Sequence, residues 1–190
     1  MNAADMKIAT ERLVLRVPTP DDAAAMATFA TSNREHFAPW DPLRSEAYFT
    51  EEHWRSELGR VVESARDGTA VKLVLLPKGG QRQRILGQCT LSGIVRGPFQ
   101  AAYLGYGLDR GAVGTGLMTE ALRAVIAFSF DELKLHRLMA NYMPTNIRSA
   151  RLLRKLGFVV EGYARDYLYL AGAWQDHVLT ALTNDRWSER

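Results

Sequence analysis

The chain has 190 residues, of which 47% are hydrophobic and 24% are charged, and this composition is typical of a globular protein of one domain, expected to span residues 1–190. No apolar run reaches the ~18 residues that would cross a membrane, and the charged first residues lack the apolar core of a secretory signal, so we expect a cytoplasmic protein. The formal charge of +3 and the scattered arginines argue against a general nucleic-acid-binding protein, and no direct DNA binding is expected.

The predicted elements alternate between strands and helices along the chain. Alternating or branched apolar residues indicate strands, apolar residues that recur every three to four positions indicate helices, and Pro and Gly mark their ends. In the first part we expect a strand at 8–17, a helix at 19–33, a loop at 36–42, a helix at 45–66 and strands at 70–76, 84–95 and 101–108. In the second part we expect a helix at 116–132, a strand at 136–143, a helix at 145–157 and strands at 158–170 and 174–183. The predicted fold is a mixed α/β sheet flanked by helices.

Two glycines, Gly114 and Gly116, stand where the strand at 101–108 ends and the helix at 116–132 begins. The unpaired N–H groups and the positive dipole end of a helix N-terminus bind phosphate, and glycines let a phosphate approach the backbone closely. The pattern is neither a Walker motif nor a Gly-x-Gly-x-x-Gly fingerprint. From these residues alone, a phosphate-binding loop and a plain turn are equally open.

A second motif lies in residues 144–158. Asn146 begins a helix, Ser149 follows one turn later, and the helix ends in Gly157 and Phe158. In this order and spacing, the glycine pair and this motif together resemble the Gcn5-related N-acetyltransferase family. The resemblance implies a mostly antiparallel sheet of six to seven strands with splayed central strands, and acetyl-CoA as cosubstrate. The residues that it places against coenzyme A are Leu108, Val113, Gly114, Thr115, Gly116, Leu117, Met118, Asn146 and Ser149.

Four further segments resemble the ribosomal-protein-alanine N-acetyltransferase branch of that family. They are residues 33–42, 95–108, 136–146 and 156–183, and with the two motifs they extend the likeness over nearly the whole chain. The resemblance implies acetyl transfer to the N-terminal alanine of small-subunit ribosomal protein five. The α-amine would attack acetyl-CoA directly in a ternary complex. The expected partner is that N-terminus, with the ribosome or an assembly intermediate as its carrier.

Three positions depart from the family pattern. Val113 stands where Gln or Arg usually opens the loop, and Thr115 stands where Lys or Arg is common. Backbone amides can still hold the pyrophosphate, so these two departures bear on the affinity for coenzyme A and leave the site itself in place. Leu153 stands where the family commonly carries a tyrosine acid, so the proton chemistry must come from other residues.

The candidate catalytic residues follow from the reaction, in which a neutral amine attacks a thioester. An N-terminal α-amine has a pKa of about 7.7–8.0, against about 10.4 for lysine, so a weak base or a water relay suffices. The resemblance implies that Glu161 activates this water; an ion pair with Arg165 or another neighbour is the structural alternative. Tyr142 and Ser149 are candidates for protonating the leaving sulfur, with packing and a coenzyme contact as their structural alternatives.

The acceptor site is expected around Trp40, Tyr106 and Tyr167, with Trp174 beside Tyr167 in the wall opposite Trp40. The resemblance implies an oxyanion donor among the backbone N–H groups of 101–108. A core position is the structural alternative for Trp40. Lys155 and its neighbour Arg154 are candidates for contacts with the coenzyme phosphates. The histidines and the single cysteine lack metal-ligand spacing, and no metal site is expected.

Two other functions stay open from the sequence. The same chemistry on a small amine, an amino acid or an antibiotic needs only a different acceptor loop. A ribosome-assembly or binding factor with a vestigial coenzyme site would account for Val113 and for Leu153. Thermal protection by coenzyme A separates the vestigial site from the two enzymes, because a ligand that binds only the folded protein stabilises it.

Overall fold

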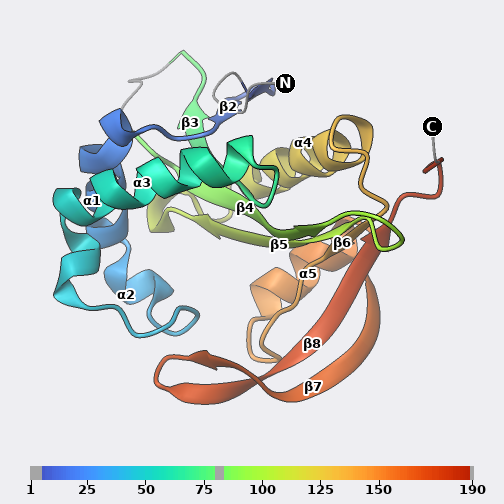
Figure 1. Cartoon of the computed structure of the whole chain (residues 1–190). Helices are drawn as coiled ribbons and strands as arrows, with labels where there is room; N and C mark the ends of the chain where they lie inside the picture. Colours follow the sequence, from blue (N-terminus) through green and yellow to red (C-terminus); the bar gives the residue numbers. More distant parts are fainter. Residues whose placement is uncertain (1–5, 80–83, 189–190) are drawn as a thin grey trace.

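The computed structural model of the protein describes residues 6–79 and 84–188 and is organised around one eight-stranded sheet (Figure 1). The strand order is β1-β2-β3-β4-β5-β6-β8-β7. The strands are β1 (Lys7–Ala9), β2 (Leu13–Arg16), β3 (Val71–Pro77), β4 (Gly87–Val95), β5 (Ala101–Leu108), β6 (Arg137–Met139), β7 (Val159–Leu170) and β8 (Ala173–Thr183). The helices are α1 (Ala23–Ser32), α2 (Arg34–Phe37), α3 (Glu51–Arg66), α4 (Leu117–Asp131) and α5 (Ile147–Lys155), with short 3-10 turns η2 (Pro20–Asp22), η3 (Glu46–Phe49) and η4 (Arg110–Ala112).

The strands β5 and β6 separate in the middle of the sheet. They form the one parallel pair among neighbours that are otherwise antiparallel, and their register covers only Ala101–Tyr103 against Arg137–Met139. Beyond Tyr103, β5 continues to Leu108 without β6 beside it. The sheet therefore opens into a gap along this half of β5, as expected for splayed central strands.

Helices cover both faces of the sheet. On one face, α4 buries Met118, Ala121, Leu122 and Val125, and α5 adds Leu153 to the same apolar cluster. On the other face, α1 and α3 pack Met26, Trp54 and Leu58 against Val74 and Leu76 of β3. The gap beside β5 connects the face of the sheet that α4 and α5 cover with the face that α1 and α3 cover.

The prediction of one strand at 8–17 was wrong, and this error accounts for the eighth strand. The segment folds into the antiparallel hairpin of β1 and β2. The hydroxyl of Thr10 accepts the Leu13 N–H at 3.0 Å and donates to the Glu120 carboxylate of α4 at 2.6 Å, and the Arg12 N–H donates to the same carboxylate at 2.8 Å. A turn without Gly, Pro or Asn is thus stabilised by a distant helix.

Three other predicted boundaries needed correction. The loop at 36–42 begins later than predicted, because α2 includes His36 and Phe37. The helix at 45–66 is divided into η3 and α3 at Thr50, whose side chain caps α3 by accepting the His53 N–H. The strand at 136–143 is shorter, since β6 ends at Met139 and only Tyr142 bridges onward, to Val178 of β8. The remaining predicted elements are confirmed within a few residues. Among the described residues, no helix is both long and apolar enough to cross a membrane.

Candidate active site

A cavity of about 1170 Å³ occupies the gap beside β5. Its lining comes from α2 and the loop after it, from β5, from the start of α4 and from the segment that leads into α5. In Figure 1 the loop after α2 lies beside the tip of the long β7–β8 hairpin, where the Ala171 N–H donates to the Asp41 carbonyl. Segments that lie far apart in the sequence thus form one continuous site.

The loop before α4 presents backbone to this cavity. Gly114 and Gly116 have φ of +85° and +81°, values that residues with a side chain rarely adopt, and both glycines line the cavity. The first N–H groups of α4 follow at Leu117 and Met118, where a helix has no internal acceptors for them. Arg12 braces the loop, donating to the Thr115 carbonyl at 3.0 Å while its guanidinium pairs with Glu120. The conformation of this loop therefore depends on its two glycines and on the hydrogen bond from Arg12.

Helix α5 turns a basic face to the same cavity. Asn146 caps it by accepting the Ser149 N–H at 3.1 Å. Arg148, Arg151 and Lys155, spaced by a helical turn, line the cavity beyond Ser149. A helix N-terminus on one wall and a row of cations on the other form a site for a polyphosphate.

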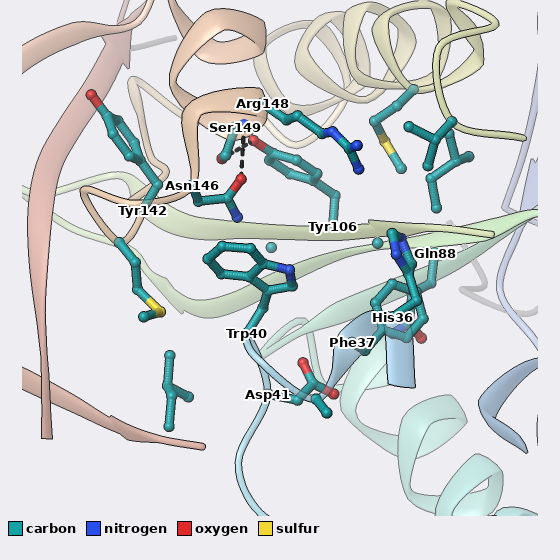
Figure 2. A pocket seen from close by; sticks show the side chains of 18 of the residues that line it. His36, Phe37, Trp40, Asp41, Gln88, Tyr106, Tyr142, Asn146, Arg148 and Ser149 are labelled. Carbon is teal, nitrogen blue, oxygen red and sulfur yellow. Dashed lines mark hydrogen bonds between the residues drawn. The ribbon is translucent and has the colours of Figure 1, made fainter. Parts of the chain in front are cut away.

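Two hydroxyl groups meet where the strands separate. The Tyr106 hydroxyl lies 2.6 Å from the Ser149 Oγ, and both residues line the cavity (Figure 2). Burial raises the pKa of the Tyr106 phenol to about 12, although the bond to Ser149 opposes the shift. The phenol therefore keeps its proton at physiological pH and is available as a donor, directly or through Ser149.

The opposite half of the cavity lies on the α1/α3 face of the sheet. Residues directly opposite each other in neighbouring strands share a face. Gln88 lies opposite Val74 of the α1/α3 cluster and also opposite Gly107, so Gln88, Gly105 and Gly107 all face this half. Tyr106 lies opposite Cys89 and faces α4 instead. The cavity thus reaches both faces of the sheet through the gap.

Trp40 and the tip of the β7–β8 hairpin close this half. Trp40 extends from the loop after α2 toward β5 (Figure 2) and lines the cavity. Its neighbour Asp41 accepts the Ala171 N–H at 2.9 Å through its backbone carbonyl. Burial raises the pKa of the Asp41 carboxyl, against the opposing charge of Arg44 at 3.6 Å.

The sequence matches one family over most of its length. Residues 12–159 match the family described as "Acetyltransferase (GNAT) domain". This chain belongs to that family.

Curated relatives of this acetyltransferase include "[Ribosomal protein uS5]-alanine N-acetyltransferase" of Escherichia coli, 42% identical over 98% of this chain and 95% of that protein. "Probable N-acetyltransferase YjcK" of Bacillus subtilis is 36% identical over 86% of this chain and 89% of that protein. Among solved structures, ribosomal-protein-S5-alanine acetyltransferase from Vibrio fischeri matches with a TM-score of 0.91 and 40% identity, covering 97% of this chain and 100% of that one. RimJ of Mycobacterium smegmatis, in complex with CoA-disulfide, matches with a TM-score of 0.89 and 28% identity over 97% of this chain and 90% of that one. The chain is an N-acetyltransferase of the acyltransferase class, and the non-enzymatic alternative is set aside.

Besides Lys155, ten of the residues predicted for the acetyltransferase site line this cavity. They are Trp40, Tyr106, Leu108, Val113, Gly114, Gly116, Met118, Tyr142, Asn146 and Ser149. The lining does not include Thr115, Leu117, Glu161, Tyr167 or Trp174. The Thr115 hydroxyl donates to the Ala112 carbonyl, and Leu117 packs against the α4/α5 core. Their side chains therefore do not line the cavity.

Tyr167 lies one layer behind the cavity wall. Its hydroxyl accepts a hydrogen bond from the Asn141 amide at 3.1 Å, and its ring lies 5.3 Å from that of His177. Asn141 and His177 both line the cavity. Tyr167 therefore supports the lining residues rather than forming the wall itself.

Glu161 is paired away from the cavity. Its carboxylate accepts from the Arg137 guanidinium of β6, and its side chain is 45% exposed. The partner is Arg137 rather than the Arg165 considered from the sequence. Leu153, in the position of the missing tyrosine acid, is buried in the core. No cluster of three or more potential metal ligands occurs within residues 6–79 and 84–188.

Sequence reasoning missed several residues of the site. Arg148 and Arg151 line the cavity, whereas Arg154 does not, although Lys155 does. The helical phase was the available signal, because residues three and four apart share a face and Asn146 marks the face toward the coenzyme. Gln88 carried no signal in the sequence, since its position depends on the register of β4 against β5.

Proposed function

We propose that the protein transfers the acetyl group of acetyl-CoA to the N-terminal α-amine of alanine in ribosomal protein uS5. The observation that carries the proposal is the 42% identity to a uS5-alanine N-acetyltransferase over 98% of the chain. This likeness takes in the half of the cavity lined by the loop before α4 and by α5, which we call the coenzyme half. It also takes in the half lined by Trp40 and Gln88, which we call the acceptor half. A likeness confined to the glycine loop and α5 would support acetyl-CoA binding alone.

The coenzyme half fits acetyl-CoA residue by residue. The backbone amides of residues 114–118 would hold the pyrophosphate, because Gly114 and Gly116 have no side chains that would cover these amides. Arg148, Arg151 and Lys155 would offset the remaining phosphate charge. Asn146 would contact the pantetheine arm with the part of its amide that the cap to Ser149 leaves free.

The β5–β6 gap then holds the thioester. Asp109 donates its N–H to Leu86, on the β4 side, at 2.8 Å, and successive strand amides point to opposite sides, so the Leu108 amide faces the gap as an oxyanion donor. As the amine nitrogen bonds to the carbonyl carbon and the C–S bond breaks, the sulfur takes a proton from the Tyr106–Ser149 pair. Tyr142, which also lines the cavity, is a second donor to this position.

The amine needs little help to lose its proton. With a pKa of about 7.7–8.0, a substantial minority of an N-terminal α-amine is neutral at pH 7. As it attacks, the amine nitrogen loses one of its two protons to water in the cavity, and the other stays as the N–H of the new amide. We assign no protein base, because Glu161 is paired with Arg137 and does not line the cavity.

The test is intact-mass measurement after incubation with acetyl-CoA and a peptide of the mature uS5 N-terminus. A matched peptide that starts with serine and a pool of free amino acids serve as competing acceptors. We expect a gain of one acetyl group on the alanine peptide. Acetylation of the free amino acids in place of either peptide would overturn the acceptor and leave the acetyltransferase class intact.

A further inference from the structure

We infer that Gln88 recognises the acceptor. Its side-chain carbonyl oxygen, Oε1, accepts a hydrogen bond from the backbone N–H of the acceptor's second residue. This inference rests on the proposed peptide acceptor and goes further, by naming the residue that distinguishes a peptide from a simple amine.

The Gln88 Oε1 atom is an acceptor in need of a donor. It is buried and has no hydrogen-bond partner within the described part of the chain, and Gln88 lines the acceptor half of the cavity. In native proteins, the large majority of buried side-chain polar atoms have a partner, because an unpaired buried acceptor costs about 1–3 kcal/mol. A turn of the amide into the cavity that Gln88 lines would let a substrate N–H satisfy it.

The strand beside Gln88 leaves room for a peptide backbone. Gly107 lies opposite Gln88, and Gly105 lies two residues before it on the same face of β5. A Cβ built on Gly105 would meet nothing within 4 Å, whereas one on Gly107 would meet the Phe37 ring at 3.3 Å. An acceptor chain can therefore lie against the bare backbone of β5 at Gly105, with Phe37 limiting it at Gly107.

The spacing selects the second residue as the donor. The amine must reach the gap between β5 and β6, whereas Gln88 belongs to β4, on the other side of β5. Neighbouring strands lie about 4.8 Å apart, and each extended residue advances the chain about 3.5 Å. An acceptor that enters over β4 with its amine at the gap thus carries its first peptide N–H above β5, within reach of the Gln88 side chain.

The test is a cycle of two proteins and two peptides. The proteins are the wild type and Gln88→Met, which keeps the length of the side chain without its carbonyl. The peptides are the uS5 N-terminal peptide and the same peptide methylated at the backbone nitrogen of its second residue. We expect methylation to lower kcat/KM of the wild type about tenfold and that of Gln88→Met by less than about twofold.

Thr90→Val is the matched control, because Thr90 lies two residues along β4 on the same face and does not line this cavity. It should respond to methylation as the wild type does. An unchanged KM for acetyl-CoA shows that each variant is folded. Equal losses in the wild type and in Gln88→Met, or no loss in either, would overturn the role of Gln88. Failure of the wild type to acetylate the unmethylated peptide would instead overturn the proposed function, so the two failures are distinguishable.

Discussion

The two halves of the cavity are built in different ways. The coenzyme half comes from two short continuous stretches, residues 108–118 and 142–155, which offer backbone amides, a helix N-terminus and one helix face. The acceptor half draws on α2, the loop after it, β4 and β5, which offer individual side chains such as Trp40 and Gln88. Backbone-based binding tolerates a change of side chain, whereas side-chain-based binding does not. For this reason Val113 and Thr115 can depart from the family pattern without removal of the site.

The largest effect is expected where the two halves meet. Replacing Ser149 with Ala and Tyr106 with Phe together removes both hydroxyls of the proposed acid pair. General acid catalysis contributes about 10²–10⁴-fold, so we expect kcat to fall about 100-fold with little change in the KM for either substrate. Steady-state kinetics measure this. The control is Tyr163→Phe, which removes an exposed hydroxyl that bonds Asp176 outside the cavity; a comparable loss in that variant would contradict the role of the pair.

A weaker but selective effect is expected at the glycine loop. Gly114→Val forces a branched side chain into φ +85° and covers the amides, so the KM for acetyl-CoA should rise about 30-fold while the KM for the peptide stays the same. Gly68→Val imposes the same kind of strain, at φ +69°, outside the cavity. If both variants raised the acetyl-CoA KM equally, the effect would come from backbone strain and the phosphate role would be lost.

Much of the coenzyme half could be predicted from the sequence because its determinants are local. Gly116 begins α4 and Asn146 begins α5, as the capping patterns of the sequence predict. The hairpin at Thr10 could not be predicted in this way, since the carboxylate that stabilises it belongs to Glu120, 110 residues away. Likewise, the unpaired oxygen of Gln88 exists only once β4 is in register with β5. Where a contact joins distant segments, no local sequence pattern indicates it.

The pH dependence should follow the acceptor rather than the enzyme. Only the neutral amine attacks, so kcat/KM for the peptide should rise as the pH increases through the amine pKa of about 7.7–8.0, by about 20-fold between roughly pH 6.5 and 8.5. The Tyr106 phenol, with its pKa raised by burial to about 12, stays protonated throughout that range. A profile with kcat/KM measured up to about pH 10 checks this. A decline of the rate centred below about pH 10 would exclude the Tyr106–Ser149 pair as the acid.

In the acceptor half, Trp40→Ala should raise the KM for the peptide about fivefold and leave the KM for acetyl-CoA unchanged. The indole lines the cavity near β5, and its loss widens the space around the first residues of the acceptor. Trp174→Ala is the matched control, because that indole is 60% exposed and does not line the cavity. Equal effects in the two variants, or an effect on acetyl-CoA instead, would show that the two halves are not separable.

The smallest effect is expected from Glu161→Gln. A general base must lie within hydrogen-bond reach of its proton, or one water away, and the Glu161 carboxylate is instead held by Arg137 outside the cavity lining. An amide oxygen can still accept from Arg137, and exposed ion pairs contribute about 0–1 kcal/mol, so we expect kcat within about twofold and a small loss of thermal stability. Arg137→Gln is the control, because it breaks the same ion pair and keeps the Glu161 carboxylate. If the pair is only structural, both variants should have the same stability and the same kcat. A marked fall in kcat for Glu161→Gln alone, with an altered pH profile, would mean that this pair opens when the acceptor binds and that the carboxylate then activates a water.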